Sequence, residues 1–232
     1  MLGILTLDTA FPRIAGDVGA PETFDFPVMR EVVAGAYVED VVHRRRETLL
    51  PAFVDAGRRL VDAGCTGIAT TCGFLVRWQK ELTEALPVPV MTSALLQLPL
   101  VERTLPAGRH AGIVTYSAAD LGADALAAAG IDPYAPIEGI EPGSYFEQTI
   151  RLGRPTLDPV RMREDTVAAA RRLLRNHPHV AAIVLECANM PPYRDAVQDA
   201  TGLPVYDAAQ LCRWFHAGLA RVPPHRTRRN LW

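Results

Sequence analysis

Short apolar runs bounded by turn residues alternate along this chain with longer segments of helical periodicity. Strands are predicted at Leu2–Leu7, Gly67–Thr70, Val88–Thr92, Ala111–Thr115, Val180–Leu185 and Val205–Asp207. Helices are predicted at Thr48–Ala63, Phe74–Leu86, Ala118–Ala129, Pro159–Arg175 and Pro192–Ala200. Strands that alternate with helices predict an α/β fold whose parallel sheets are covered on both faces.

The chain also contains an internal repeat. Pro89 follows Cys72 by 17 positions, and Pro204 follows Cys187 by the same 17 positions. The strands upstream are similar as well, and their sequences are Gly3-Ile-Leu-Thr-Leu-Asp8 and Gly112-Ile-Val-Thr-Tyr-Ser117. Two alignments in the same order indicate two halves of similar topology rather than chance.

The repeat predicts two pseudo-symmetric α/β domains, at residues 1–98 and 99–215, and a tail at residues 216–232, although chain exchange would blur the boundary. Cys72 and Cys187 each follow a predicted strand and precede a predicted helix. Open parallel sheets bind ligands at this position, outside the carboxyl ends of the strands. We therefore predict an active site in the cleft between the domains, with two thiols facing one molecule from opposite sides.

Composition favours a small-molecule partner. The chain has 232 residues and a net charge of -2, which creates no field that would collect nucleic acid or an anionic membrane. It has no apolar run long enough for a membrane span and no signal-peptide pattern, so we expect a cytoplasmic protein. Arg226, Arg228 and Arg229 form a short basic run that we interpret as a solvated tail or a subunit contact.

The sequence favours chemistry without a cofactor or a metal. Its four cysteines form no CxxC pair and have no metal-like spacing with histidine, so reduced thiols are expected. Lys80 is the only lysine and lies in a polar stretch typical of a helix surface, which disfavours pyridoxal phosphate. Neither GxGxxG nor GxxxxGK[ST] is present, which disfavours nucleotide cofactors.

Two facing thiols suit proton exchange at a carbon atom. Inversion requires a base on one face and an acid on the other, and a thiolate is a competent base where backbone donors lower its pKa. Both cysteines precede predicted helices, so the backbone N–H groups of Gly73, Phe74, Ala188 and Asn189 are expected to receive a thiolate, a carboxylate or an enolate oxygen. Cys65 and Cys212 lack these surroundings and are interpreted as buried structural residues.

Polar residues at the predicted strand ends suit a small carboxylate. The candidates for substrate binding beside the thiols are Asp8, Thr9, Thr71, Tyr116, Ser117 and Asn189. Thr71 and Ser117 are also suited to capping helices, Asp8 to a turn and Tyr116 to the core. Arg13 is either a carboxylate partner or a surface residue, and Glu186 either orients Cys187 or binds an arginine.

These segments resemble the aspartate/glutamate racemase superfamily, which also includes hydantoin racemases, maleate isomerases and arylmalonate decarboxylases. The resemblance covers about residues 2–215 and rests on Asp8-Thr9, Thr70-Thr71-Cys72-Gly73, Thr115-Tyr116-Ser117 and Cys187-Ala188-Asn189. It implies two pseudo-symmetric α/β domains with the active site between them, no cofactor and commonly a homodimer. It also implies that Cys72 and Cys187 are the catalytic pair.

The chain departs from glutamate racemases, which usually continue the first cysteine with Asn-Thr and the second with Thr-His. Here Gly73-Phe74 and Ala188-Asn189 stand at these places. The leading hypothesis is a PLP-independent racemase or epimerase of a small carboxylate, an amino acid or a relative. The alternatives are a maleate isomerase-like cis-trans isomerase or a decarboxylase with Cys72 as nucleophile, and a non-catalytic protein that binds small carboxylates.

Overall fold

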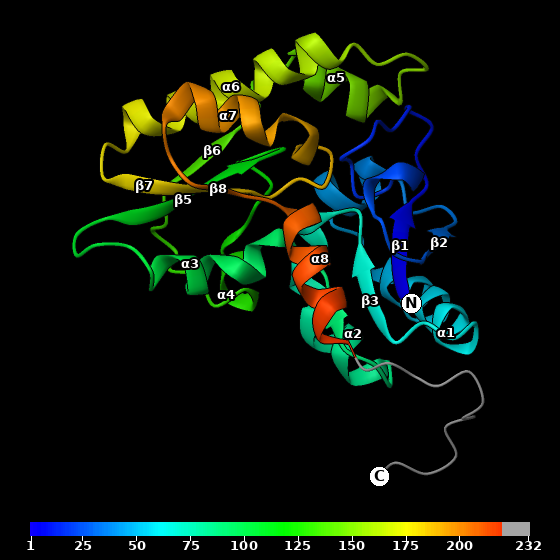
Figure 1. The fold of residues 1–232 in the computed structure, drawn as a ribbon. Coiled ribbons are helices and arrows are strands. Elements are labelled where there is room, and N and C mark those ends of the chain that lie inside the picture. Colours follow the sequence, from blue (N-terminus) through cyan, green and yellow to red (C-terminus); the bar gives the residue numbers. More distant parts are fainter. Residues whose placement is uncertain (220–232) are drawn as a thin grey trace.

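The computed structural model describes residues 1–219, and its two four-stranded parallel sheets have the same topology (Figure 1). The first sheet has the order β2-β1-β3-β4 and contains β1 (Leu2–Leu7), β2 (Val28–Val33), β3 (Gly67–Thr70) and β4 (Val90–Met91). The second has the order β6-β5-β7-β8 and contains β5 (His110–Thr115), β6 (Ile137–Gly139), β7 (Val180–Leu185) and β8 (Val205–Tyr206). The predicted pair of pseudo-symmetric α/β units is confirmed.

Helices cover both faces of the second sheet, with α6 and α7 on one side and α3 and α4 on the other (Figure 1). The α-helices are α1 (Leu50–Asp62), α2 (Gln79–Ala85), α3 (Leu98–Glu102), α4 (Ala123–Ala128), α5 (Tyr145–Leu152), α6 (Pro159–Asn176), α7 (Arg194–Thr201) and α8 (Ala208–Gly218). The described part of the chain also contains five 3₁₀ segments and one π-helical turn, at Pro21–Thr23, Glu39–His43, Glu47–Leu49, Gly73–Trp78, Ala94–Gln97 and Pro191–Tyr193. Within residues 1–219, no helix combines the length and apolar character that crossing a bilayer requires.

A glycine near the start of each central strand lets a helix pack closely on the sheet. A Cβ atom added at Gly3 would lie 3.1 Å from Leu60 of α1, and one added at Gly112 would lie 2.7 Å from Leu173 of α6. Such distances leave no room for a side chain in a close-packed interior. The glycine that the sequence repeat places in each half therefore has the same role in packing a helix on the sheet.

Helix α8 follows the second sheet in the chain but packs against the first. Arg213 donates a hydrogen bond to the Thr23 carbonyl at 2.7 Å, and the His216 ring stacks on Phe26 with centroids 3.7 Å apart. Figure 1 shows α8 in orange and red, and it also contacts the 3₁₀ segment Ala94–Gln97. The arginines of the predicted tail, Arg226, Arg228 and Arg229, lie outside the described residues.

The apolar pattern did not predict β2 and β6, each of which forms one edge of its sheet. Most residues of these two strands are partly exposed, so their sequences lack the continuous apolar run of a buried parallel strand. Val32 of β2 is 55% exposed, whereas every residue of β1 is buried. The short helices α3 and α5 were also missed, and the predicted helix at Phe74–Leu86 is a 3₁₀ segment followed by α2.

Candidate active site

Cys72 and Cys187 line one pocket between the two sheets. Cys72 lies two residues after β3 and directly before the 3₁₀ segment Gly73–Trp78, and Cys187 lies two residues after β7. Both are buried, with 7% and 9% of their surface exposed. The structure thus brings together the two thiols that the repeat singled out, one from each half.

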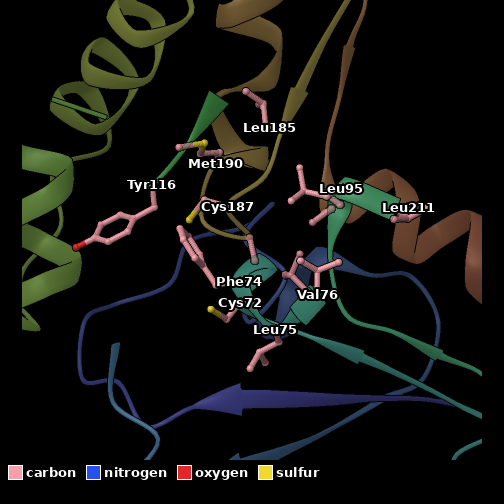
Figure 2. Packing of buried hydrophobic residues seen from close by; sticks show 14 of the residues in the cluster. Cys72, Phe74, Leu75, Val76, Leu95, Tyr116, Leu185, Cys187, Met190 and Leu211 are labelled. Carbon is pink, nitrogen blue, oxygen red and sulfur yellow. The ribbon is translucent and has the colours of Figure 1, made fainter. Parts of the chain in front are cut away.

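The pocket around the thiols is mainly apolar. Its lining comprises the aromatic residues Phe11, Phe74 and Tyr116, the aliphatic residues Leu7, Val38, Val42 and Ile150, and the polar residues Thr9, Arg13, Thr71, Glu186 and Asn189, together with Gly73 and the cysteines. In the view of Figure 2, the Phe74 side chain lies between the sulfur atoms of Cys72 and Cys187. The pocket volume is about 30 Å³, enough for roughly one water molecule, so a carboxylate ligand enters only if lining side chains move.

Three of the predicted binding residues do not line this pocket. The Asp8 carboxylate accepts a hydrogen bond from the Gly35 N–H at 3.0 Å, and the Ser117 hydroxyl donates to Asp120 at 2.5 Å. Ala188 contributes its carbonyl oxygen to a backbone hydrogen bond from Val18. Their contacts with a substrate stay predictions, whereas Thr9, Thr71, Gly73, Phe74, Tyr116 and Asn189 all line the pocket.

Burial makes the Cys72 thiol a weak acid. Desolvation and then the nearby Glu186 carboxylate raise its pKa to about 12, although the backbone N–H groups of Phe74 and Leu75 and the Arg77 charge lower it. Of the two backbone donors expected beside Cys72, Phe74 therefore acts on the sulfur, and Leu75 acts on it in place of Gly73. Their effect on the pKa is smaller than that of burial, which corrects the expectation that they make the thiol acidic.

Cys187 is also held in the thiol form. Desolvation and the Glu186 carboxylate raise its pKa well above the ordinary value, and the backbone N–H of Asn189 only partly offsets them. The Cys187 Sγ atom donates a hydrogen bond to Asn189 Oδ1 at 3.4 Å. An acceptor of this kind stabilises the protonated sulfur, so the two thiols have different surroundings despite their equivalent places in the fold.

Glu186 is a fully buried carboxyl group between the two cysteines. Its Oε2 atom accepts hydrogen bonds from Thr115 Oγ1 at 2.8 Å and from the Tyr116 N–H at 3.4 Å, while Oε1 has no partner among the described residues. A Cβ atom added at Gly73 would lie 2.0 Å from Oε1, so only glycine fits there. Desolvation raises the Glu186 pKa to about 7, and the bonds from Thr115 and Tyr116 oppose this rise.

Arg13 and Asp17 belong to the site although the sequence left the role of Arg13 open and did not single out Asp17. Arg13 lines the pocket and donates to Asp17 Oδ1 at 2.9 Å and to Thr9 Oγ1 at 3.1 Å. Asp17 is buried and in turn accepts a hydrogen bond from Asn189 Nδ2 at 2.5 Å. No spacing in the sequence links Asp17 to Asn189, because the two residues are 172 positions apart.

The family of the chain follows from a direct match. The model of the Asp/Glu/hydantoin racemase family matches residues 52–214, well over half of the sequence. The chain belongs to this family. The resemblance inferred from the two cysteine segments is thereby confirmed.

Members of this family and their structural relatives catalyse different reactions. The chain is 31% identical to the dimethylsulfoniopropionate lyase of Durusdinium sp. clade D, over 96% of this chain and 76% of the relative. It is 31% identical to dimethylsulfoniopropionate lyase 7 of Emiliania huxleyi, over 96% of this chain and 68% of the relative. These relatives are lyases, so the match does not support racemisation in preference to elimination.

Solved structures of similar fold include a decarboxylase and a racemase. A mutant of arylmalonate decarboxylase aligns with a TM-score of 0.63 at 18% identity, covering 96% of both chains. Allantoin racemase from Klebsiella pneumoniae aligns with a TM-score of 0.61 at 19% identity, covering 95% of this chain and 90% of the racemase. At these identities the likeness concerns the fold, which the two enzymes share despite their different reactions.

Proposed function

We propose that this protein is a cofactor-independent lyase that cleaves a β-sulfonium carboxylate of the dimethylsulfoniopropionate type, with Cys72 and Cys187 at its reaction centre. The observation that carries the proposal is the pair of buried thiols in one apolar pocket, in a chain whose similarity to dimethylsulfoniopropionate lyases extends over 96% of its length. The leading hypothesis from the sequence, racemisation, becomes the second candidate.

The reaction needs one base and no external reagent. The Cys72 thiolate takes the proton from the carbon next to the carboxylate, the electron pair of that C–H bond forms the carbon–carbon double bond, and the bond from the β carbon to sulfur breaks. Neutral dimethyl sulfide leaves with the electron pair of this bond, and acrylate remains. The proton taken by Cys72 returns to water, so the thiolate is regenerated for the next turnover.

A sulfonium group suits this pocket better than an uncharged substituent does. Phe74 and Tyr116 line it, and aromatic faces attract cations by about 0.5 to 2 kcal/mol. The Phe11 ring is already covered by the Arg13 guanidinium, 4.9 Å from its centroid. The Glu186 carboxylate adds an acidic group to the same pocket. A bound cation would also stabilise the thiolate of Cys72, which offsets part of the desolvation that makes this thiol a weak acid.

Product analysis tests the proposed activity. The purified protein is incubated with dimethylsulfoniopropionate, and dimethyl sulfide is measured in the headspace while acrylate is measured in solution. We expect equal amounts of both products. The matched control is β-trimethylammonio propionate, which has the same charges but a poorer leaving group and is expected to inhibit cleavage without being cleaved.

Racemisation remains the second candidate because the two thiols come from equivalent places in the two halves. It is tested in the same protein preparation with chiral amino and hydroxy acids, followed by loss of optical activity. Inversion of one of these acids, with no dimethyl sulfide from the sulfonium compound, would contradict the lyase proposal and support a racemase. Absence of both activities would contradict both.

A further inference from the structure

The loop after β1 reaches across to the segment that carries Cys187. The Val18 N–H donates a hydrogen bond to the Ala188 carbonyl at 3.1 Å. Gly16 has a φ of 101° and packs so closely on Pro192 that an added Cβ would lie 3.1 Å from its Cα. The loop of the first half is therefore held against the residues that follow the second thiol.

A chain of hydrogen bonds connects this loop to the Cys187 sulfur. Cys187 Sγ donates to Asn189 Oδ1 at 3.4 Å, and Asn189 Nδ2 donates to Asp17 Oδ2 at 2.5 Å. The other carboxylate oxygen of Asp17 accepts from Arg13 at 2.9 Å and from the Gly19 N–H at 2.7 Å. Asp17 and Asn189 are buried, with 3% and 8% of their surface exposed.

The Asp17 carboxylate determines which way the Asn189 amide points. An ionised carboxylate only accepts hydrogen bonds, so Asn189 must present its NH₂ group to Asp17. The amide oxygen then faces Cys187 and accepts from its S–H group. With the amide reversed, two oxygen acceptors would face each other in a buried place, which is costly.

Within residues 1–219, no hydrogen-bond acceptor is found for the Cys72 sulfur that would correspond to Asn189. The groups that stabilise its charged form are the backbone N–H groups of Phe74 and Leu75 and the side chain of Arg77. Donors and a positive charge favour a thiolate, whereas the acceptor beside Cys187 favours a thiol. The ionisable groups that act on Cys187 or are affected by it are Asp17, Cys72, Tyr116, Glu186 and Tyr193.

We infer that Asp17 is a positioning residue which, through Asn189, keeps Cys187 in the hydrogen-bond-donating thiol form and leaves Cys72 as the base. An unequal pair fits an elimination, because dimethyl sulfide needs no proton when it leaves and the second thiol can remain a donor to the substrate carboxylate. A racemase needs thiols that exchange roles. The inference rests on the proposed function for this consequence, but the state of Cys187 can be measured without any substrate.

The test is the variant Asp17→Asn, assayed by site-resolved alkylation. Iodoacetamide reacts with the thiolate, so the labelling rate at a fixed pH, measured by mass spectrometry of the peptides that contain Cys72 and Cys187, reports the thiolate fraction of each cysteine. Without the carboxylate, the Asn189 amide is free to turn its NH₂ group toward the sulfur. We expect labelling of Cys187 at a fixed pH to become about tenfold faster, corresponding to one pKa unit, while Cys72 is unchanged.

Two further variants distinguish a change in the orientation of the Asn189 amide from a general loosening of the loop after β1. Thr23→Val removes hydroxyl bonds to Gly16 and to the Asp17 carbonyl but leaves the Asp17 carboxylate in place, so the labelling rates of both cysteines should stay unchanged. The exchange Asp17→Asn with Asn189→Asp keeps one hydrogen bond between these positions and restores an acceptor next to Cys187. Labelling of Cys187 should then return to the rate of the natural protein or below it.

Specific outcomes would overturn the inference. It is wrong if Asp17→Asn leaves the labelling rate of Cys187 unchanged, or if the exchanged pair labels as fast as Asp17→Asn. It is also wrong if Thr23→Val accelerates labelling as much as Asp17→Asn. Because alkylation needs no substrate, failure of the lyase assay alone would overturn the proposed function and leave the assignment of Asp17 intact.

Discussion

Replacing Cys72 with serine is expected to lower kcat/KM for cleavage of dimethylsulfoniopropionate by about 10²- to 10⁴-fold, the usual range for loss of a general base. Serine preserves the shape of the residue, but its hydroxyl is a much weaker acid than a thiol and supplies almost no base. Cys187→Ser should retain more activity than Cys72→Ser, because a serine hydroxyl still donates a hydrogen bond. The measurement is the initial rate of acrylate release.

The matched control for this prediction is Cys65→Ser. Cys65 is also a buried free cysteine, with 3% of its surface exposed, but it lies outside the pocket. Its serine variant should keep the activity of the natural protein once equal amounts of folded protein are compared. An equal loss in Cys65→Ser and Cys72→Ser would assign the effect to packing, and full activity in Cys72→Ser would remove this residue from the mechanism.

The second large effect is expected for Glu186→Gln, as a change in how stability depends on pH. The Glu186 pKa rises from its ordinary value of 4.5 to about 7 in the folded protein. The folded state therefore binds the proton more tightly than the unfolded state, and the free energy of unfolding falls as pH rises between these values. At about 1.4 kcal/mol for each pH unit, the loss from pH 4.5 to pH 7 is roughly 3 kcal/mol.

Glutamine cannot ionise, so it removes this loss. Compared with the natural protein, Glu186→Gln should gain up to roughly 3 kcal/mol more stability at pH 8 than at pH 4.5, as measured by urea unfolding at the two pH values. The control is Glu84→Gln, because Glu84 is 66% exposed and should show no such difference. If the natural protein and Glu186→Gln have the same pH dependence, Glu186 does not hold a proton at neutral pH.

Glu186→Gln is also expected to change the pKa of the two thiols. The Glu186 charge raises the pKa of both Cys72 and Cys187, second only to burial. Removing that charge should shift alkylation of both cysteines to lower pH. This pattern differs from that of Asp17→Asn, which should move Cys187 alone, so the two variants distinguish the groups that control the pair.

The central strands and the repeat were predictable because buried parallel strands have a simple signature. Leu2–Leu7, Gly67–Thr70 and Val180–Leu185 have the predicted bounds, since each is a continuous apolar run ended by polar residues. The strand Ile137–Gly139 was not predictable, because three partly exposed residues carry no periodicity. The helix Tyr145–Leu152 was missed for a related reason, since eight residues hold little more than two turns.

In the site, the sequence predicted the position of the thiols but not their surroundings. Cys72 and Cys187 could be identified from the repeat, since parallel strands bring equivalent ends to equivalent places. Asp17 could not be assigned, because its contact with Asn189 depends on how the two halves pack. The pKa of Cys72 was predicted in the wrong direction, because helix starts are visible in a sequence whereas the degree of burial depends on side chains from the whole chain.

The most direct test of the account is a competition between dimethylsulfoniopropionate and the same compound with deuterium on the carbon next to the carboxylate. Both are mixed with the protein, and the composition of the remaining substrate is followed by mass spectrometry. If a thiolate removes this proton, the protiated form is consumed faster or the deuterium is lost from the remaining substrate. The three-carbon product is analysed as well, because elimination leaves only one deuterium on this carbon of acrylate. Release of dimethyl sulfide with both deuterium atoms retained in the three-carbon product would contradict proton abstraction at this carbon.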